Sequence, residues 1–457
     1  MKRFRKGIRL PEFKDRTLAS IQIHLPSSPS VVTIPLNHKA NGPLAPCVQE
    51  GDPVCVGTKL AEGSDQNSVP VYSSVSGCVS KVCQDLIQIE SDYADRLDRS
   101  IKVREEIPSD ASQLIEMIRE AGMVDLGGSG IPIHTRLLDA RSSGVEFVIV
   151  NGCESEPFLT ADHVLVMNYP AEILKGAELI RIACGAKRAV IAVERNKREA
   201  AELLNSKNYN LKIKTIETMM LPVRYPQDSE GVLAETVTDK VIDPNSSIIS
   251  QGVLVEHVAT AFGVYEAIYL RKPLYERVVT VSGPCFAEPK NMWARTGVPA
   301  IELIRESKGF LRDPDRVIFG GPMTGQAISD LQTPVTMDVT GIVALPHELV
   351  PSEEEEACIR CGLCVDVCPE ALVPETLVRA VRIHNDRLAQ EYDIDACTEC
   401  GCCAYVCPSK IPIIRVIQEG KRNVCEKTAS TSVPTLHHRP LRAVGAMTAG
   451  ASHSELP

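Results

Sequence analysis

The chain has 457 residues, a length that predicts three or four domains and excludes a single small binding module. Hydrophobic residues make up 44% and charged residues 24%, a balance that excludes global disorder. The 49 Lys and Arg residues against 59 Asp and Glu give a formal net charge of −10, which repels phosphate backbones, so nucleic acid is not an expected partner.

No apolar run approaches the ~18 residues that a membrane-spanning helix requires, and the best short run, residues 145–150, has the length of a strand. The N-terminus is basic, as in a signal peptide, but Pro11 and charged residues stand where the apolar core of such a peptide would be. We therefore expect a cytoplasmic protein without a transmembrane segment of its own, either free or peripheral on the cytoplasmic face of a membrane through partner subunits.

Residues 1–100 predict a small β-module. Short strands and turns punctuated by Gly and Pro run from residue 31 to about residue 90, in VVTIPL, EGDPVCVGTKLAEG and SVPVYSSVSGCVSKV. Two half-motifs, each a turn followed by alternating Val, resemble the barrel-sandwich hybrid fold of lipoyl and biotinyl carriers. No Met-Lys-Met tip is present, so we expect a packing role rather than a swinging prosthetic group.

Residues 109–272 predict a Rossmann-type α/β domain. Amphipathic SQLIEMIREAGM is followed by the buried strand VEFVIVNG, the helix PAEILKGAELIRIACG and the strand RAVIAVE, an alternation typical of a mainly parallel sheet. Residues 273–345 then give a strand, a Pro-rich loop carrying the only Trp, Trp293, and one helix. We interpret this segment as a small β-grasp unit of the SLBB-like kind.

Two sets of residues in the α/β region are candidates for ligand binding. Gly127, Gly128 and Gly130 form a turn of the kind whose amides can approach a phosphate, although such a turn can also be only a tight loop. Polar side chains follow the strand VEFVIV and are expected at the C-terminal edge of the sheet, where ligands bind in open α/β folds: Asn151, Glu154, Ser155, Glu156 and Asp162.

Residues 346–427 predict a helical domain with two iron–sulfur motifs. Ten of the 17 cysteines lie between residues 358 and 425, and the spacing C-x2-C-x2-C-x3-C-P occurs twice. In this pattern the fourth Cys binds the other cluster, so the expected ligand sets are Cys358, Cys361, Cys364 and Cys407 for one cluster and Cys397, Cys400, Cys403 and Cys368 for the second. The alternative, zinc, gives no reason for the three-plus-one spacing or for the two Cys-Pro endings.

The segment between the motifs contains LVRAVRIHNDRLAQEYD, which predicts one amphipathic helix. Its length resembles the helical ferredoxin domain of multi-subunit redox enzymes. Cys402 is expected to pack beside a cluster rather than to bind iron. Residues 428–457 are rich in Ser, Thr, Ala and Pro without periodicity, so we expect a disordered tail.

Four motifs in this order, between the β-module and the double ferredoxin, resemble the C subunit of the Rnf electron-transport complex: GGSGIP with Arg136, NGCESEPFLTAD, YPQDSEG and GVLVEHVATA. The α/β part also resembles the flavin- and NADH-binding subunit of respiratory complex I. The resemblance implies two [4Fe-4S] clusters, FMN, and NADH as substrate. It maps flavin binding onto Gly127, Gly128, Gly130, Arg136, Asn151, Glu154, Ser155, Glu156 and Thr260.

The chain departs from the family pattern at several of these positions. Asp125 stands where the family has Gly or another small residue, and its carboxylate would repel a flavin phosphate unless it points away. Ile131 replaces a Phe that could stack on adenine, which bears on NADH more than on FMN. His257 replaces an Asn and is either a donor to the flavin or only a filler. The remaining departures are Ser129 for Ala, Ile133 for Thr and Arg136 for Lys.

These features together predict an electron-transfer subunit of an NADH:ferredoxin-type oxidoreductase, which passes electrons between NADH or another donor and two [4Fe-4S] clusters through FMN. Expected partners are other subunits of a membrane-bound or soluble redox complex, and a ferredoxin or flavoprotein. No side chain needs to act as acid or base, so no catalytic residue is expected. Two alternatives remain: a flavin-deficient iron–sulfur adaptor that has lost NADH binding, and a partner of a corrinoid or other substrate reductase.

Overall fold

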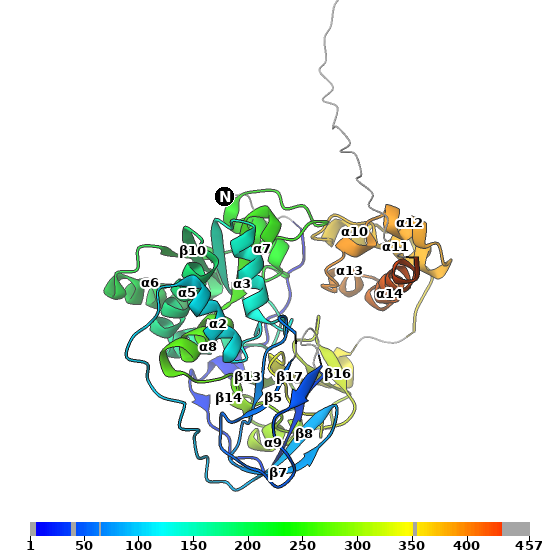
Figure 1. Cartoon of the computed structure of the whole chain (residues 1–457). Coiled ribbons are helices and arrows are strands. Elements are labelled where there is room, and N and C mark those ends of the chain that lie inside the picture. The colour runs from blue at the N-terminus through cyan, green and yellow to red at the C-terminus, as the bar shows by residue number, and fades with distance from the viewer. Residues whose placement is uncertain (1–5, 38–42, 64, 351–353, 432–457) are drawn as a thin grey trace, which may run out of the picture.

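The computed structural model describes residues 6–37, 43–63, 65–350 and 354–431, with side chains placed up to residue 424. Figure 1 shows two β-rich parts and a helical α/β part packed together, and a Cys-rich helical domain beside them. The mixed α/β architecture agrees with the prediction. Within the described ranges, every helix is too short or too polar to span a bilayer.

The β-module consists of two small antiparallel sheets around one core. Buried and partly exposed residues alternate along β2, so that Val32 and Ile34 face inward, and Ile87 and Ile89 of β8 oppose them. This alternation is the pattern expected for a sheet with one buried face. The strands are β2 (Val31–Pro35), β8 (Leu86–Ser91), β7 (Gly77–Val82) and β4 (Pro53–Val54), then β3 (Leu44–Pro46), β5 (Lys59–Gly63) and β6 (Val71–Tyr72).

The segment before the β-module runs across the other units. Phe13 stacks on Phe158 with ring centroids 5.0 Å apart, and Ile8 forms a β-bridge with Tyr225. After the short helix α1 (Asp15–Leu18), β1 (Ile23–His24) joins the distant six-stranded sheet rather than the β-module. The start of the chain therefore helps to hold the α/β layer and the six-stranded sheet together.

The α/β layer is built on a four-stranded, fully parallel sheet in the order β11-β10-β9-β12. Val148 and Val150 pack into the core on one face, and Ile149 packs into the core on the other. Because all strands run the same way, their carboxyl ends lie at one edge. The strands are β9 (Phe147–Gly152), β10 (Arg188–Glu194), β11 (Ile216–Leu221) and β12 (Val253–His257).

Helices cover both faces of this sheet. The tightest contact joins α5 and α8 at Gly176, where an added Cβ would lie 1.7 Å from the carbonyl oxygen of Ala261, so only glycine permits this approach. One face carries α2 (Ala111–Glu120), α3 (Ile133–Ser142), α4 (Ala161–Asn168), α5 (Pro170–Cys184), α6 (Arg198–Leu211) and α8 (Val258–Leu270), and the other carries α7 (Glu230–Thr238).

The next unit is a six-stranded mixed sheet in the order β1-β14-β13-β17-β15-β16 with helix α9 (Ala300–Glu306). Trp293, predicted in a loop, lies in β14 instead, opposite Val278 of β13. The loop prediction was wrong because the antiparallel partner of this strand could not be seen locally. The strands are β13 (Glu276–Ser282), β14 (Lys290–Arg295), β15 (Arg316–Phe319), β16 (Gln326–Ile328) and β17 (Gly341–Leu345).

The Cys-rich domain is helical, and the single helix predicted between its two motifs is two helices. His384 has a φ of 52°, which ends α11, and the Asn385 side chain accepts a hydrogen bond from the Leu388 amide to begin α12. The helices are α10 (Leu363–Val367), α11 (Pro374–Arg382), α12 (Asp386–Glu391), α13 (Cys402–Tyr405) and α14 (Ile413–Thr431). Most of the predicted tail, residues 432–457, lies outside the described residues.

Candidate functional site

A cavity of about 370 Å³ lies at the carboxyl edge of the parallel sheet. We call it the sheet-edge cavity. Its position and size are those of a cofactor site in an open α/β fold. It is lined by the glycine turn, the ends of β9 and β12, the start of α7 and the second Cys motif, through Asp125, Gly127, Ser129, Asn151, Glu156, Tyr225, Pro226, Asp228, Ser229, Glu230, Val255, Glu256, His257, Thr324, Thr398 and Cys400.

A second cavity of about 720 Å³, the side cavity, shares part of this lining and extends toward the six-stranded sheet. Gly127, Glu156, Asp228, His257 and Thr324 line both cavities. Of the residues predicted to hold flavin, five therefore line one or both cavities: Gly127, Gly128, Asn151, Glu154 and Glu156. The other four, Gly130, Arg136, Ser155 and Thr260, line neither cavity.

Asp125 points into the glycine turn rather than away from it. Its carboxylate accepts hydrogen bonds from the amides of Gly127 at 3.0 Å and Ser129 at 3.2 Å, and from the Ser129 hydroxyl at 2.6 Å. The Thr260 hydroxyl donates a further bond at 3.3 Å. The sequence suggested the amides of the glycine turn as donors to a phosphate. In the structure they donate to the carboxylate of Asp125 instead.

The charge of Asp125 is stabilised where it lies. Burial opposes the ionised form, but the neighbouring His257 and the hydrogen bonds from Ser129 and Gly127 outweigh it, so the pKa of Asp125 is lowered. Gly128 has a φ of +113°, a conformation that L-residues rarely adopt, and an added Cβ would meet only the Asp338 carbonyl at 3.9 Å. Glycine at position 128 therefore permits this backbone conformation and leaves open space beside it.

Arg136, predicted near a flavin phosphate, is held by two carboxylates. Its guanidinium lies 2.9 Å from Glu256 and 2.8 Å from Glu230, and it also donates to the Val255 carbonyl at 2.6 Å. Because it does not line either cavity and is paired twice, Arg136 orients the carboxylates of the wall. Glu256 keeps one buried oxygen without a hydrogen-bond partner among the described residues.

Asn151 and Ser155 are likewise occupied by contacts within the protein. The Asn151 amide donates to the Asp228 carbonyl at 3.0 Å, and the Asn151 side-chain oxygen accepts from the Cys153 amide at 3.0 Å. The Ser155 hydroxyl donates to the Asp228 carboxylate. These contacts join the loop after β9 to the loop before α7. Asn151 and Ser155 therefore help to shape the sheet-edge cavity.

Glu156 is held by a segment that no sequence motif had singled out. Its carboxylate accepts hydrogen bonds from the amides of Met323 at 3.0 Å and Thr324 at 2.9 Å, and from the Thr324 hydroxyl at 2.6 Å. Gly321 must be glycine here because an added Cβ would lie 2.4 Å from the Glu156 carboxyl. The available signal was the glycine-rich GGPMTG that follows β15.

Two acids of the cavity wall titrate near neutrality. Burial raises the pKa of Glu156 to about 7 against the hydrogen bonds from Thr324, and burial raises the pKa of Glu256 to about 7 against the charge of Arg136. Both groups gain negative charge as the pH rises through 7. The charge of the sheet-edge cavity therefore changes within the physiological range.

His257 ends β12 and lines both cavities. Its Nε2 lies 3.1 Å from Asp162, and its Nδ1 is buried without a hydrogen-bond partner among the described residues. Burial disfavours the charged ring, but Asp162 and Asp125 outweigh burial and raise the pKa of His257. The ring can therefore present a free donor to a ligand.

We expect FMN to bind more weakly as the pH rises from about 6.5 to about 8.5. Glu156 and Glu256, whose pKa values are about 7, ionise as the pH rises, and each new negative charge repels an anionic ligand. Flavin fluorescence quenching on titration of the cluster-loaded, flavin-free protein measures the dissociation constant at each pH. In Glu256→Gln the pH dependence should flatten, whereas an identical slope would exclude Glu256 as its source.

Glu154 belongs to a buried ion network rather than to a free site. Lys197 lies 3.2 Å from Glu154 and 3.7 Å from Glu194, and Lys14 donates to the Glu154 carbonyl. Burial lowers the pKa of Lys14 and raises that of Glu194, whereas the two carboxylates outweigh burial and raise the pKa of Lys197. This network fixes the loop after β9 to the end of β10.

Lys197→Met is expected to destabilise the fold by about 3 to 5 kcal/mol, because it removes the ammonium group that pairs with the buried carboxylates of Glu154 and Glu194. The free energy of unfolding in denaturant measures the change. The matched control is Lys187→Met, which removes an exposed lysine 3.0 Å from Glu146 and should cost less than about 1 kcal/mol. Equal losses in both variants would contradict a structural role for the network.

The cysteines of the two motifs line two separate cavities. A small cavity of about 20 Å³ is lined by the proximal set, Cys368, Cys397, Cys400 and Cys403, together with Cys402 and Thr398. A cavity of about 440 Å³ is lined by the distal set, Cys358, Cys361, Cys364 and Cys407. In the described part of the chain, no three His, Cys, Asp or Glu side chains are placed to hold a single metal ion.

The proximal set lies against the sheet-edge cavity. Thr398 and Cys400 line both, and the Tyr225 hydroxyl donates to the Cys400 carbonyl at 2.6 Å. Cys402 is fully buried in an apolar group with Ile8 and Tyr225, and it also lines the small cavity of the proximal set. Tyr225 was not among the predicted site residues, and its signal was its place in YPQDSEG.

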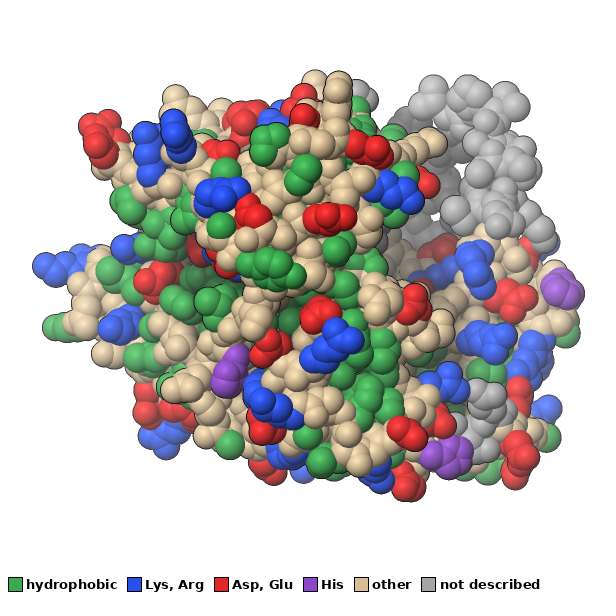
Figure 2. All heavy atoms as spheres, turned by 90° about the horizontal axis from the view of Figure 1, so that it is seen from below, with side chains coloured by type: hydrophobic (Ala, Val, Ile, Leu, Met, Phe, Trp, Pro, Cys, Tyr) green, Lys and Arg blue, Asp and Glu red, His purple; other side chains and the backbone are tan. Residues whose placement is uncertain are grey.

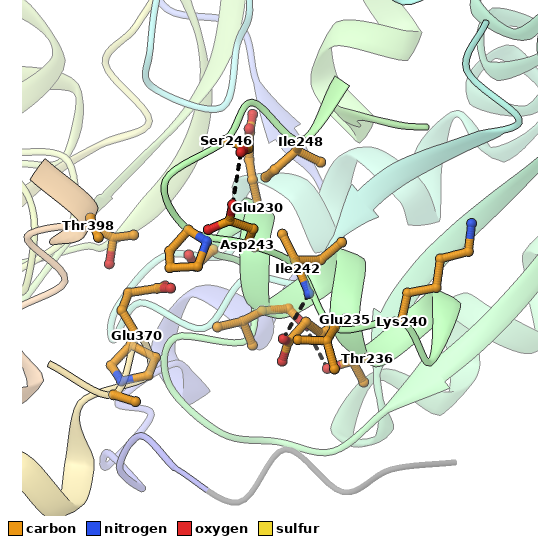
Figure 3. A pocket seen from close by; sticks show the side chains of 18 of the residues that line it. Glu230, Glu235, Thr236, Lys240, Ile242, Asp243, Ser246, Ile248, Glu370 and Thr398 are labelled. Atoms are coloured by element: carbon orange, nitrogen blue, oxygen red, sulfur yellow. Dashed lines mark hydrogen bonds between the residues drawn. The ribbon is translucent and has the colours of Figure 1, made fainter. Parts of the chain in front are cut away.

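A larger cavity of about 1000 Å³ separates α7 from the Cys-rich domain on the far side of Glu230. Figure 3 shows Glu370 and Thr398 of the Cys-rich domain on one side, with Glu235 and Ile242 on the other. The Ile242 amide donates to the Glu235 carboxylate at 3.1 Å. Thr398 and Glu230 line both this cavity and the sheet-edge cavity, so the two cavities adjoin between α7 and the Cys-rich domain.

Three family models match the chain in the order of these units. The RnfC barrel-sandwich hybrid domain matches residues 2–97, the Nuo51 FMN-binding domain matches residues 118–266, and the 4Fe-4S dicluster domain matches residues 354–411. The predicted β-module, flavin domain and dicluster domain are confirmed by these matches. They support FMN and [4Fe-4S] clusters as cofactors.

Whole-chain comparisons agree with the domain order. The chain is 34% identical over 383 residues to the C subunit of the Na⁺-translocating ferredoxin:NAD⁺ oxidoreductase complex from Acetobacterium woodii, covering 81% of this chain and 85% of that protein. It is 31% identical over 388 residues to the C subunit of the proton-translocating ferredoxin:NAD⁺ oxidoreductase complex from Clostridium ljungdahlii, covering 82% and 84%. A solved NAD⁺-reducing [NiFe]-hydrogenase aligns at 18% identity over 70% of this chain and 63% of that chain, with a TM-score of 0.49. By its sequence relatives over most of both lengths, the chain belongs to the RnfC family of C subunits of ion-translocating oxidoreductase complexes.

Proposed function

We propose that this chain is the electron-transfer subunit of an Rnf-type ferredoxin:NAD⁺ oxidoreductase complex. The observation that carries the proposal is the shared wall between the sheet-edge cavity and the proximal cysteine set, formed by Thr398 and Cys400. The names of the two relatives support the overall reaction and the multi-subunit partner. Since ferredoxin and NAD⁺ are carriers of the cytoplasm, the proposal places the chain on the cytoplasmic face of the membrane.

The size of the sheet-edge cavity fits a flavin. Its volume of about 370 Å³ lies in the range of cofactor sites, and the free Nδ1 of His257 supplies a donor that nothing in the described chain uses. FMN exchanges electrons in pairs with nicotinamide and singly with iron–sulfur clusters. In this proposal the glycine turn lines the ligand's space through Gly127, His257 donates to the ligand, and Arg136 orients Glu230 and Glu256 in the wall.

The cysteine sets order the sites along the molecule. We assign one [4Fe-4S] cluster to the proximal set and one to the distal set, with each fourth ligand, Cys368 or Cys407, taken from the other motif. The proximal set touches the flavin cavity, and the distal set reaches the surface, where Cys358 and Cys361 are exposed. Electrons therefore travel between the cavity and the surface through two single-electron sites.

Pyridine nucleotide is the less supported substrate in this proposal. Five carboxylates line the sheet-edge cavity: Asp125, Glu156, Asp228, Glu230 and Glu256. They disfavour a pyrophosphate beside the flavin. Ile131 also offers no aromatic face for adenine. Binding of NADH therefore stays a prediction. If NADH does not bind, the two alternatives are favoured: the iron–sulfur adaptor and the partner of a corrinoid reductase.

Anaerobically purified protein is expected to contain about eight irons and eight acid-labile sulfides per chain, from two cubanes, together with acid-extractable FMN. Iron analysis and the visible spectrum before and after acid extraction measure both cofactors. Iron–sulfur absorbance without extractable flavin, after incubation with excess FMN, would favour the adaptor instead. Iron near four after reconstitution, or zinc in the site, would overturn the two-cluster assignment.

A further inference from the structure

The Cys-rich domain has a core of its own and forms a lobe beside the rest of the described chain. Its buried apolar residues lie between Cys368 and Val424 and pack on one another. Figure 2 shows this lobe at the right, as seen from below Figure 1. Domains with separate cores move relative to one another by default, so the contacts at the junction decide where the proximal cysteine set lies.

A short segment near the start of the described chain crosses this junction. The Gly7 amide donates to the Val367 carbonyl at 3.0 Å, directly before a cysteine of the proximal set. The amide and carbonyl of Ile8 exchange two hydrogen bonds with the carbonyl and amide of Tyr225, each 2.9 Å long. Residues 7–10, which we call the strap, therefore contact the Cys-rich domain and the α/β layer at once.

Tyr225 extends these contacts to the second cysteine motif. Its hydroxyl donates to the Cys400 carbonyl at 2.6 Å, and the residue is only 3% exposed. Arg224, the preceding residue, donates to the Gly7 carbonyl at 3.0 Å. The strap and Tyr225 thus hold both stretches of chain that supply the proximal set, one beside Cys368 and one at Cys400.

The same contacts exclude water from one side of the proximal set. Ile8, Tyr225 and Cys402 form a buried apolar group, and Cys402 is fully buried. Leu10 and Met323 pack against this group. A [4Fe-4S] cluster held by four thiolates carries a net negative charge that grows on reduction, so exclusion of water here disfavours the reduced form.

The first cysteine motif has the same backbone turn without this cover. Gly362 and Gly401 follow the second Cys of each motif with φ and ψ of 79° and −7° against 82° and −8°. Leu363, which corresponds to the buried Cys402, is 43% exposed. The turn itself therefore needs no cover, and the strap adds one at the proximal set.

We propose that the strap and Tyr225 are positioning elements, which clamp the proximal cysteine set beside the sheet-edge cavity and shield its cluster from water. Gly7 suits this task because its φ of 76° lies in the left-handed region that favours glycine. The proposal rests on the proposed function and adds the residues that fix its inner redox site. It gives a role in electron transfer to a segment far in sequence from the flavin and cysteine motifs.

The first test measures opening of the junction in the full-length protein with both clusters. Tyr225→Phe removes one hydroxyl and should raise the hydrogen exchange of amides in residues 6–10 and 223–228 about tenfold. Mass spectrometry of the peptides that contain these residues measures the exchange. Tyr72→Phe is the matched control, because the Tyr72 hydroxyl also donates from a buried ring to a backbone carbonyl, that of Glu120. The control should leave exchange at the strap unchanged.

The second test measures the reduction potential of the proximal cluster by redox titration followed by electron paramagnetic resonance. Ile8→Ser admits water beside Cys402 and should favour reduction about tenfold, which raises the potential by about 59 mV for one electron. Phe13→Ser removes a half-exposed ring from the same stretch of chain and should leave the potential unchanged. The distal cluster should keep its potential in both variants, because its turn is already exposed. Cys361→Ser, which lacks the distal cluster, assigns the two signals.

Two comparisons decide between a positioning role and a merely structural one. Faster exchange in Tyr225→Phe and a raised proximal potential in Ile8→Ser, with both controls unchanged, support the strap. Equal exchange at the strap in Tyr225→Phe and Tyr72→Phe would overturn it, as would equal proximal potentials in Ile8→Ser and Phe13→Ser. If Ile8→Ser does not fold with both clusters, the nearly isosteric Tyr225→Phe decides the question by exchange and potential together.

Failure of the strap is distinguishable from failure of the proposed function. Iron content and extractable FMN are measured on every variant, and neither amide exchange nor the cluster potential requires flavin. A wild-type protein with two clusters and no FMN would overturn the flavin part of the proposed function, while both tests of the strap stay decisive. Two clusters and FMN, with no effect of the strap variants, would overturn the strap alone.

Discussion

Replacing Cys397 by Ser is expected to remove the proximal cluster and to cut the distal cluster off from the flavin cavity. The proximal set alone shares walls with that cavity, so its loss leaves a gap between the flavin site and the distal site. Iron should fall from about eight to about four per chain. Electron paramagnetic resonance measures how fast the remaining cluster is reduced through the flavin. This rate should fall at least about a hundredfold, because an essential redox centre is missing from the path.

Three further cysteine variants control this result. Cys361→Ser removes the distal cluster and should leave reduction of the proximal cluster unchanged. Cys368→Ser should resemble Cys397→Ser although it lies in the first motif, because Cys368 lines the proximal cavity. Cys402→Ser changes a buried thiol of the same turn and should retain about eight irons. A distal cluster that is still reduced at the normal rate in Cys397→Ser would show that the order of sites is wrong.

Asp125→Gly is expected to tighten FMN binding about tenfold or more. The carboxylate occupies the amides of Gly127 and Ser129, and its removal returns these donors to the ligand and removes a negative charge from the cavity. Flavin fluorescence titration of the cluster-loaded, flavin-free protein measures the dissociation constant. Asp125→Asn separates the two causes, since it removes the charge but keeps a side chain in the turn.

Two further variants test the interpretation of the Asp125→Gly result. Asp239→Gly removes an exposed carboxylate at the end of α7, outside the lining of the sheet-edge cavity, and should leave FMN affinity unchanged. Gly128→Val places a branched side chain at a φ of +113°, which strains the glycine turn beside Gly127 in the wall of the sheet-edge cavity, and should abolish FMN binding while iron content stays the same. If neither Asp125→Gly nor Gly128→Val changes the FMN affinity of a protein that binds FMN, then the flavin lies elsewhere.

Arg136 shows which contacts a motif leaves out. The sequence places a basic residue shortly after a glycine turn, which is the usual position for a phosphate partner. In the structure Glu256, 120 residues further on, lies 2.9 Å from its guanidinium. The pairing depends on β12 lying next to β9 in the sheet, and local spacing holds no information on that neighbour.

Spacing along the chain was enough to predict the units and their chemistry. The alternation of Val32 and Ile34, the buried run of β9 and the two C-x2-C-x2-C-x3-C-P repeats are local patterns, because the distance between residues in sequence sets which side chains share a face or a turn. The family motifs implied FMN and the clusters by resemblance. The departures from the family pattern at Asp125 and His257 can be read directly from the sequence.

The directions and contacts of those side chains came from the packing of distant segments. Packing held Glu156 on Met323 and Thr324, which lie in the loop between β15 and β16, and brought Cys400, rather than the distal set, to the sheet-edge cavity. The bonds of Asp125 to Gly127 and Ser129 are the exception, because they span only two and four residues. Most of these contacts join segments far apart in the chain or depend on how domains pack. Their energies come from long-range burial and electrostatics, which no local pattern of residues encodes.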